Sequence, residues 1–92
     1  MTAEPWRVEL STRAQRDLAR LPPKVVVAVV EFITAVLPES PERLSKPLTA
    51  PLDGLRSARR GDYRVLFELH ESDPVVLVVR VAHRAHAYRP ER

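Results

Sequence analysis

Apolar and charged residues alternate at the start of the chain, which predicts a short strand over residues 6–10 with one buried face. Ser11 and Thr12 follow, and both are residue types that cap helices. Gln15 stands three positions after Thr12, as in a capping box. Apolar residues then recur at helical spacing, so we expect a short helix over residues 12–20.

A second helix is predicted over residues 24–37, although the many valines there favour a strand by themselves. The segment is long for a strand and has no internal turn signal, and Pro23 suits the first turn of a helix. Its expected buried stripe is Val26, Val30, Ile33 and Leu37. We expect this helix to run antiparallel to the first.

The rest of the chain predicts a loop followed by two hairpins. Four prolines interrupt residues 38–53, so no regular element is expected there. The expected strands cover residues 55–60, 63–70 and 75–84. The element order is therefore β-α-α-β-β-β. It predicts an α+β fold in which two antiparallel helices pack on a small, mostly antiparallel sheet.

Two apolar sets define the expected buried face of the last two strands. In residues 63–70 the set is Tyr63, Val65, Phe67 and Leu69. In residues 75–84 the set is Val75, Leu77, Val79 and Val81. We expect both sets to face the helices, and this fixes the strand pairing, because a slip by one residue would bury arginine.

The opposite, open face is then rich in arginine. Alternation places Arg64, Arg80 and Arg84 on it. Parity across the Gly-Asp turn brings Arg59 beside Arg64, with Ser57 next along the strand. Crowded guanidinium groups repel one another unless an anion lies among them, so we expect a phosphate-binding groove. The alternative is that Arg80 pairs with Glu68 and that the other arginines are solvated.

The distribution of charge along the chain also favours a polyanionic partner. Residues 54–92 hold eight basic and five acidic side chains, whereas residues 1–53 hold seven of each. Thirteen of the fifteen basic residues are arginine, whose planar fork matches phosphate.

Composition also excludes several classes of protein. Ninety-two residues suffice for a single domain, 1–92, with one core. Without cysteine there is no disulfide, thiolate nucleophile or sulfur-ligated zinc. The three histidines do not have the spacing of a helical zinc pair, so we expect no metal and no other cofactor. No apolar run could span a bilayer and the N-terminus lacks the pattern of a secretory signal, so a cytoplasmic protein without membrane contact is expected.

The tail after the last predicted strand adds titratable and aromatic groups. His83 and His86 are candidates for a general base or acid, and Tyr88 for stacking on a nucleotide base. The alternative is a solvated tail in which Tyr88 covers the edge of the core. If the groove holds RNA, the ribose 2′-OH can itself attack the neighbouring phosphate, so no protein nucleophile is needed.

These motifs resemble the C-terminal signature of the RelE/ParE toxin superfamily. The resemblance lies in the segment 54–67, with its Gly-Asp-Tyr-Arg core at residues 61–64, in Val78 to Arg84, and in Tyr88. The element order and the first helix ending in Leu-Ala-Arg-Leu-Pro are similar too. The resemblance covers nearly the whole chain.

What the resemblance implies is the toxin of a type II toxin–antitoxin pair, held inactive by a RelB-like antitoxin in a hetero-oligomer. RelE-like members enter the ribosomal A site and cut mRNA without a metal ion. Carried over by position, Arg64 would contact the scissile phosphate, Arg84 would stabilise the transition state, and Tyr88 would stack on or orient the nucleotide.

One departure from the family affects the general base. Some RelE proteins carry two lysines before the Gly-Asp turn, and here those positions hold Leu55 and Ser57. The replacement candidates, in order of preference, are His86, His83 and Glu68. The expected catalytic residues are therefore Arg64, Arg84, His86 and Tyr88. The expected RNA-binding and phosphate-binding residues are Arg59, Arg80, His83 and Ser57.

Two other functions stay open. ParE-like members of the superfamily poison DNA gyrase and usually lack the full set of arginines and tyrosine. A basic RNA-binding or assembly domain without activity is the third possibility. The joint presence of arginines, histidine and tyrosine at the expected positions favours the nuclease.

Overall fold

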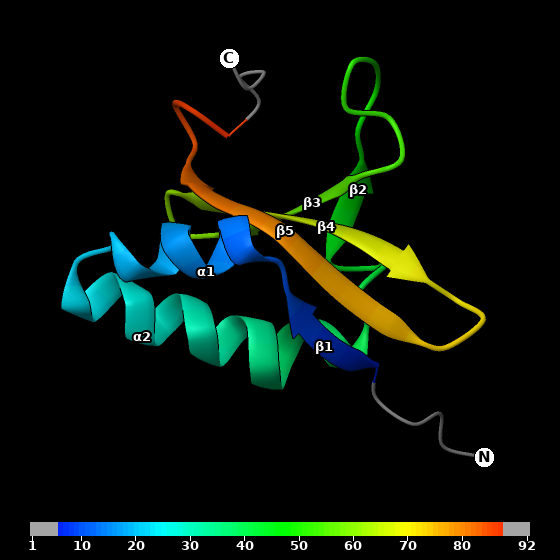
Figure 1. Cartoon of the computed structure of the whole chain (residues 1–92), viewed down its shortest axis with the longest axis horizontal. Coiled ribbons are helices and arrows are strands. Elements are labelled where there is room, and N and C mark those ends of the chain that lie inside the picture. The colour runs from blue at the N-terminus through cyan, green and yellow to red at the C-terminus, as the bar shows by residue number, and fades with distance from the viewer. Residues whose placement is uncertain (1–5, 88–92) are drawn as a thin grey trace.

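The computed structural model describes residues 6–87, and in it two helices lie against one face of a five-stranded sheet (Figure 1). The elements are β1 (Arg7–Leu10), α1 (Thr12–Ala19), α2 (Pro23–Glu31), β2 (Ser45–Pro47), β3 (Arg56–Arg60), β4 (Tyr63–His70) and β5 (Val75–His83). The strand order is β1-β5-β4-β3-β2. Only the β1–β5 pair is parallel, which confirms the α+β class with a mostly antiparallel sheet.

Helix α1 is capped by Ser11 and tied to the sheet at two points. The Ser11 hydroxyl accepts a hydrogen bond from Ala14 N at 3.0 Å and donates one to Val79 O at 3.1 Å. Asp17 Oδ2 accepts from Val81 N at 2.9 Å. Because β1 ends opposite Val78, it cannot pair with the following residues of β5, and the Ser11 and Asp17 side chains provide hydrogen bonds for Val79 O and Val81 N there. The capping box expected from Thr12 does not form, since Gln15 donates to Leu10 O instead.

The second helix widens near its end, and this changes which residues it buries. After α2 the chain makes a π-helical turn over Phe32–Val36 and a 3₁₀ turn over Leu37–Glu39. A regular helix would bury Val36 on the stripe of Val29, but the wider turn buries Leu37 and leaves Val36 45% exposed. The predicted stripe is right for Ile33 and Leu37 and wrong for Val30, which is 39% exposed.

A β-bulge overturns the predicted buried set of β5. Leu66 pairs with Arg80 while Phe67 pairs with Val78, so Val79 is the extra residue. The alternation therefore changes phase. The core cluster contains Val76 and Val78, while the predicted Leu77 and Val79 are only partly buried and the predicted Val75 is buried outside that cluster. Beyond the bulge the prediction is right: the core takes Val81, and from β4 it takes Val65 and Phe67.

The segment predicted to be a loop contains the edge strand β2, which pairs antiparallel with β3. Pro47 is compatible with pairing here because an edge strand has one side without a partner. The Arg56 side chain fastens the two strands together. Its Nε donates to Ser45 Oγ at 2.7 Å, and its Nη2 donates to Glu42 O at 3.2 Å.

The β3–β4 turn holds Gly61 at a φ of +60°, a backbone conformation that glycine adopts without the steric cost of a Cβ. This tight connection fixes the register that the turn motif predicts, with Arg60 opposite Tyr63. Over residues 6–87 no helix has the length and apolar character needed to cross a bilayer.

Candidate anion-binding site

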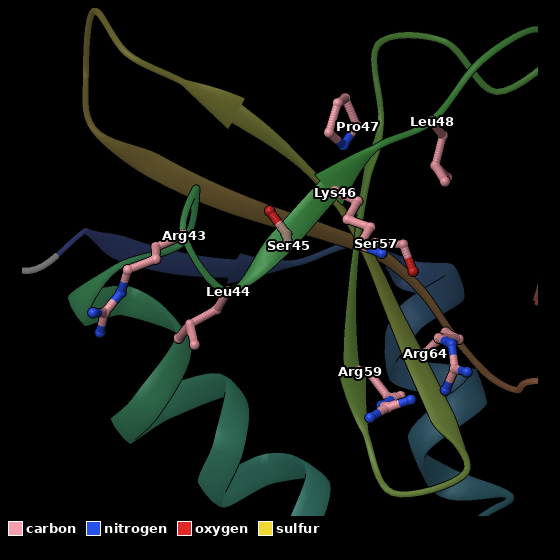
Figure 2. Close-up of a pocket in the computed structure, with 9 residues that line it drawn as sticks. All are labelled: Arg43, Leu44, Ser45, Lys46, Pro47, Leu48, Ser57, Arg59 and Arg64. Carbon is pink, nitrogen blue, oxygen red and sulfur yellow. The ribbon is translucent and has the colours of Figure 1, made fainter.

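Two arginines face each other across the β3–β4 pair, on the side of the sheet away from the helices. Arg59 is the direct partner of Arg64, as the turn parity predicts, and Val65 beside them faces the core. Both arginines border a hollow of about 660 Å³ between this hairpin and β2, shown in Figure 2. Its lining residues are Arg43, Leu44, Ser45, Lys46, Pro47, Leu48, Ser57, Arg59 and Arg64.

The hollow is strongly cationic. Four of its lining side chains are basic and none is acidic. Arg64 donates from Nη1 to two backbone carbonyls, Tyr63 O at 3.3 Å and Gly61 O at 3.5 Å. Like charges this crowded gain stability from an anion placed among them, and guanidinium groups offer it paired donors.

Arg84 lies at the same end of the sheet, next to the β3–β4 turn. It follows the last residue of β5, one position beyond the strand. Its backbone N donates to Asp62 O at 2.7 Å, and its Nε lies 4.0 Å from Asp62 Oδ1. Since Arg64 reaches towards Gly61 O, both arginines are anchored to the same two-residue turn.

Two further predicted residues lie on the open face. Ser57 lines the hollow and is buried, and it pairs with Leu66 of β4. Arg80 is half-buried on the other side of Leu66. Glu68, considered as a partner of Arg80 and as a base candidate, has its Oε1 2.9 Å from His70 Nε2.

His83 ends β5, and His86 follows in the next turn. His83 pairs with Tyr63, and their rings meet edge to face with centroids 5.5 Å apart. Because Tyr63 alternates with Arg64, His83 lies on the opposite face of the sheet from Arg64. Its Nδ1 accepts from Ala85 N at 3.2 Å, so a neutral His83 carries its proton on Nε2.

His86 lies in the turn that follows β5 and is exposed. Its backbone N donates to His83 O at 2.8 Å, and the two imidazole rings have centroids 6.5 Å apart. The structure thus brings the two base candidates close to each other, at the end of the sheet where Arg84 begins the turn. Tyr88 lies outside the described residues.

Sequence reasoning missed the contribution of the segment around β2. Arg43 and Lys46 both line the hollow, yet they fall in the stretch that its prolines marked as a loop. A signal was present, because proline and lysine together are typical of a protected edge strand. Ser45-Lys46-Pro47 has that composition.

Comparison with known proteins places these features in a family. The profile of the ParE toxin of type II toxin–antitoxin systems matches residues 8–88. Toxin RelG of Mycobacterium tuberculosis is 46% identical over 85 residues, which make up 92% of this chain and 98% of that protein.

Solved structures agree with this match. The crystal structure of the toxin–antitoxin complex RelBE2 from M. tuberculosis matches with a TM-score of 0.84 and 44% identity, over 88% of this chain and 100% of that chain. The archaeal RelE–RelB complex from Pyrococcus horikoshii matches with a TM-score of 0.68 and 28% identity, over 91% and 100% of the two chains.

Proposed function

The chain belongs to the ParE toxin family of type II toxin–antitoxin systems, and from this premise we propose that it is a ribosome-dependent endoribonuclease that cleaves mRNA without a metal ion. It is the toxin of a RelBE-type pair, and its partner is a cognate RelB-like antitoxin. Cleavage of mRNA in the ribosomal A site would inhibit translation, and binding of the antitoxin would hold the toxin inactive.

The observation that carries this proposal is the cationic hollow beside the β3–β4 hairpin. Arg59 and Arg64 face each other there, two more basic side chains line it, and no lining side chain is acidic. An RNA backbone supplies the anion that such a cluster needs, and positive charge close to the scissile phosphate stabilises the transition state. The arginines would thereby provide the electrostatic stabilisation that a metal ion provides in other nucleases.

The proposed reaction uses the RNA as its own nucleophile. A base takes the proton of the ribose 2′-OH, the 2′-oxygen attacks the adjacent phosphorus, and the bond from phosphorus to the 5′-oxygen breaks. The leaving 5′-oxygen receives a proton, so the products are a 2′,3′-cyclic phosphate and a 5′-hydroxyl. DNA lacks the 2′-OH and would not be cut.

We assign the steps as follows. Arg64 and Arg84 stabilise the charge that develops on the phosphoryl oxygens, and Tyr88 orients the nucleotide. His86 is preferred to His83 as the base: both are exposed, but Nδ1 of His83 already accepts a backbone hydrogen bond. The contacts that hold the RNA come from Arg59, Arg80 and Ser57 on the open face, whereas His83, predicted to join them, lies on the opposite face.

The test is primer extension on a reporter mRNA in a purified translation system, with EDTA-treated protein and with ribosomes present or omitted. We expect cuts at defined codon positions only when ribosomes are present, with cyclic phosphate at the upstream ends. Intact mRNA and continued translation would contradict the proposal.

A second candidate function follows from the family profile itself, which is that of the ParE toxin. ParE-like activity would mean inhibition of DNA gyrase through protein contacts, without cleavage of RNA. The two functions separate in one experiment, because a gyrase inhibitor blocks supercoiling of plasmid DNA by purified gyrase and leaves mRNA intact on ribosomes.

A further inference from the structure

The edge strand β2 brings a lysine to the arginine face. Lys46 pairs with Ser57, which in turn pairs with Leu66, so Lys46 lies on the same face as Arg59 and Arg64. Figure 2 shows β2 on one side of the hollow and the two arginines near the tip of the hairpin. The hollow is therefore bordered by positive charge from two separate parts of the sheet.

The backbone on either side of Lys46 is held in place. Ser45 Oγ donates to Pro41 O at 2.6 Å and accepts from Arg56 Nε at 2.7 Å, while Pro47 pairs with Arg56 in the sheet. The lysine side chain itself is exposed, and in residues 6–87 its ammonium group makes no hydrogen bond or ion pair. A charge on a fixed strand with no protein partner is available to an external anion.

We propose that Lys46 binds a phosphate of the RNA chain next to the one that is cut, so that β2 forms a second phosphate subsite. This rests on the proposed function, because it assumes that RNA occupies the hollow. RNA presents its negative charges at a regular spacing, so a hollow with cations on two sides suits two successive phosphates. Lysine acts as a point charge without directional demands, which suits a contact that is independent of base sequence.

The test measures binding of a fluorescent 2′-O-methyl oligoribonucleotide, which cannot be cleaved, by anisotropy over a range of KCl concentrations. The variants are Lys46→Gln and Lys46→Arg. Lys24→Gln is the matched control, because Lys24 is an exposed lysine on α2 that does not line the hollow. Thermal unfolding of each variant checks that the fold is retained.

For Lys46→Gln we expect binding about fivefold weaker near 0.1 M salt, and a plot of log affinity against log salt shallower by about 0.7, as for the loss of one phosphate contact. Lys46→Arg restores both quantities, and Lys24→Gln matches the wild type. Equal binding by Lys46→Gln and wild type, or no binding by the wild type, would overturn this inference. Lys46-dependent binding without any cleavage of mRNA on ribosomes would overturn the proposed function alone.

Discussion

The two ends of the sheet carry similar numbers of charged residues but arrange them differently. At the β4–β5 turn, Arg7 lies 3.1 Å from Asp73 and 3.3 Å from Glu9, and its hydrogen bonds to these carboxylates raise the pKa of its guanidinium above the ordinary value. At the β3–β4 turn, Arg59 lies opposite Arg64 instead of opposite an acid. One end pairs its arginine with carboxylates of the protein, and the other places two arginines opposite each other.

The comparison shows that the number of arginines alone does not indicate a binding site. The Arg7 side chain is 57% exposed, but its Nη1 and Nη2 groups already donate to carboxylates of the protein. At the β3–β4 end the acidic group close to an arginine is Asp62, 4.0 Å from Arg84 Nε. The functional signal is thus a cluster of cations that lacks carboxylates, in a hollow that can admit a phosphate.

The largest expected effect is the loss of activity on removing Arg64, compared with the removal of Arg7 at the other end of the sheet. Arg64→Ala should slow cleavage of mRNA on ribosomes by about 100- to 1,000-fold, because it removes a charge aimed at the transition state. Arg7→Ala should leave the rate unchanged, because Arg7 pairs with Glu9 and Asp73 and none of the three lines the hollow. Single-turnover rates measured by quantitative primer extension compare the two variants.

Equal cleavage rates for Arg64→Ala and Arg7→Ala would contradict the proposal that only the β3–β4 end of the sheet acts on RNA. Unfolding in urea provides the control for this comparison. Arg64 is a half-buried residue of β4 whose hydrogen bonds reach only nearby backbone carbonyls, so the Arg64→Ala protein should remain folded.

The next largest effect concerns Arg56, whose side chain joins β2 to β3 beside the cationic hollow. Arg56→Ala removes the side chain that fastens β2 to β3, and it should lower the free energy of unfolding by about 2 kcal/mol, because a charged donor with several acceptors is lost. It should also weaken RNA binding, because Lys46 loses its fixed strand.

The matched control for Arg56→Ala is Arg60→Ala. Arg60 lies on the same strand and is exposed, and in residues 6–87 its side chain makes no hydrogen bond or ion pair. Urea unfolding measures both variants. A loss of stability equal to that of Arg60→Ala would show that Arg56 does not fasten β2.

The smallest expected effect concerns the turns themselves. Gly61→Ala should cost about 1 kcal/mol, because an alanine at positive φ is strained. No other atom lies within 4 Å of the added Cβ, so the cost should come from the backbone alone. Ser72→Ala in the β4–β5 turn is the control and should change the unfolding midpoint little. Gly61→Ala with an unchanged midpoint would contradict this reading of the turn.

Most of the fold could be predicted from the sequence, because strand alternation and turn chemistry act locally. The Gly-Asp turn fixed the register of Arg59 against Arg64 correctly. The same alternation failed on β5 because a bulge at Val79 shifts its phase. The bulge lies where α1 holds β5 through Val79 O and Val81 N, a tertiary contact that a local pattern does not reveal.

The site could be predicted only for the strands that were recognised. Strand β2 was predicted as loop because four prolines interrupt this part of the chain. Its pairing depends on β3 and on the Arg56 side chain more than on local propensity. Lys46 was therefore not considered. His83 was predicted to bind RNA, but it pairs with Tyr63 and lies on the face opposite the arginines, as the alternation that places Arg80 and Arg84 on the open face also requires.

The most direct test of the central claim is an NMR titration of the whole chain with an uncleavable 2′-O-methyl oligoribonucleotide. We expect amide shift changes at residues 43–48, 57–66 and 84–87, with little change at residues 7–9 and 68–75. Changes centred on the β4–β5 turn or on the helices would contradict the assignment of the RNA site to the cationic end of the sheet, and so would the absence of any change.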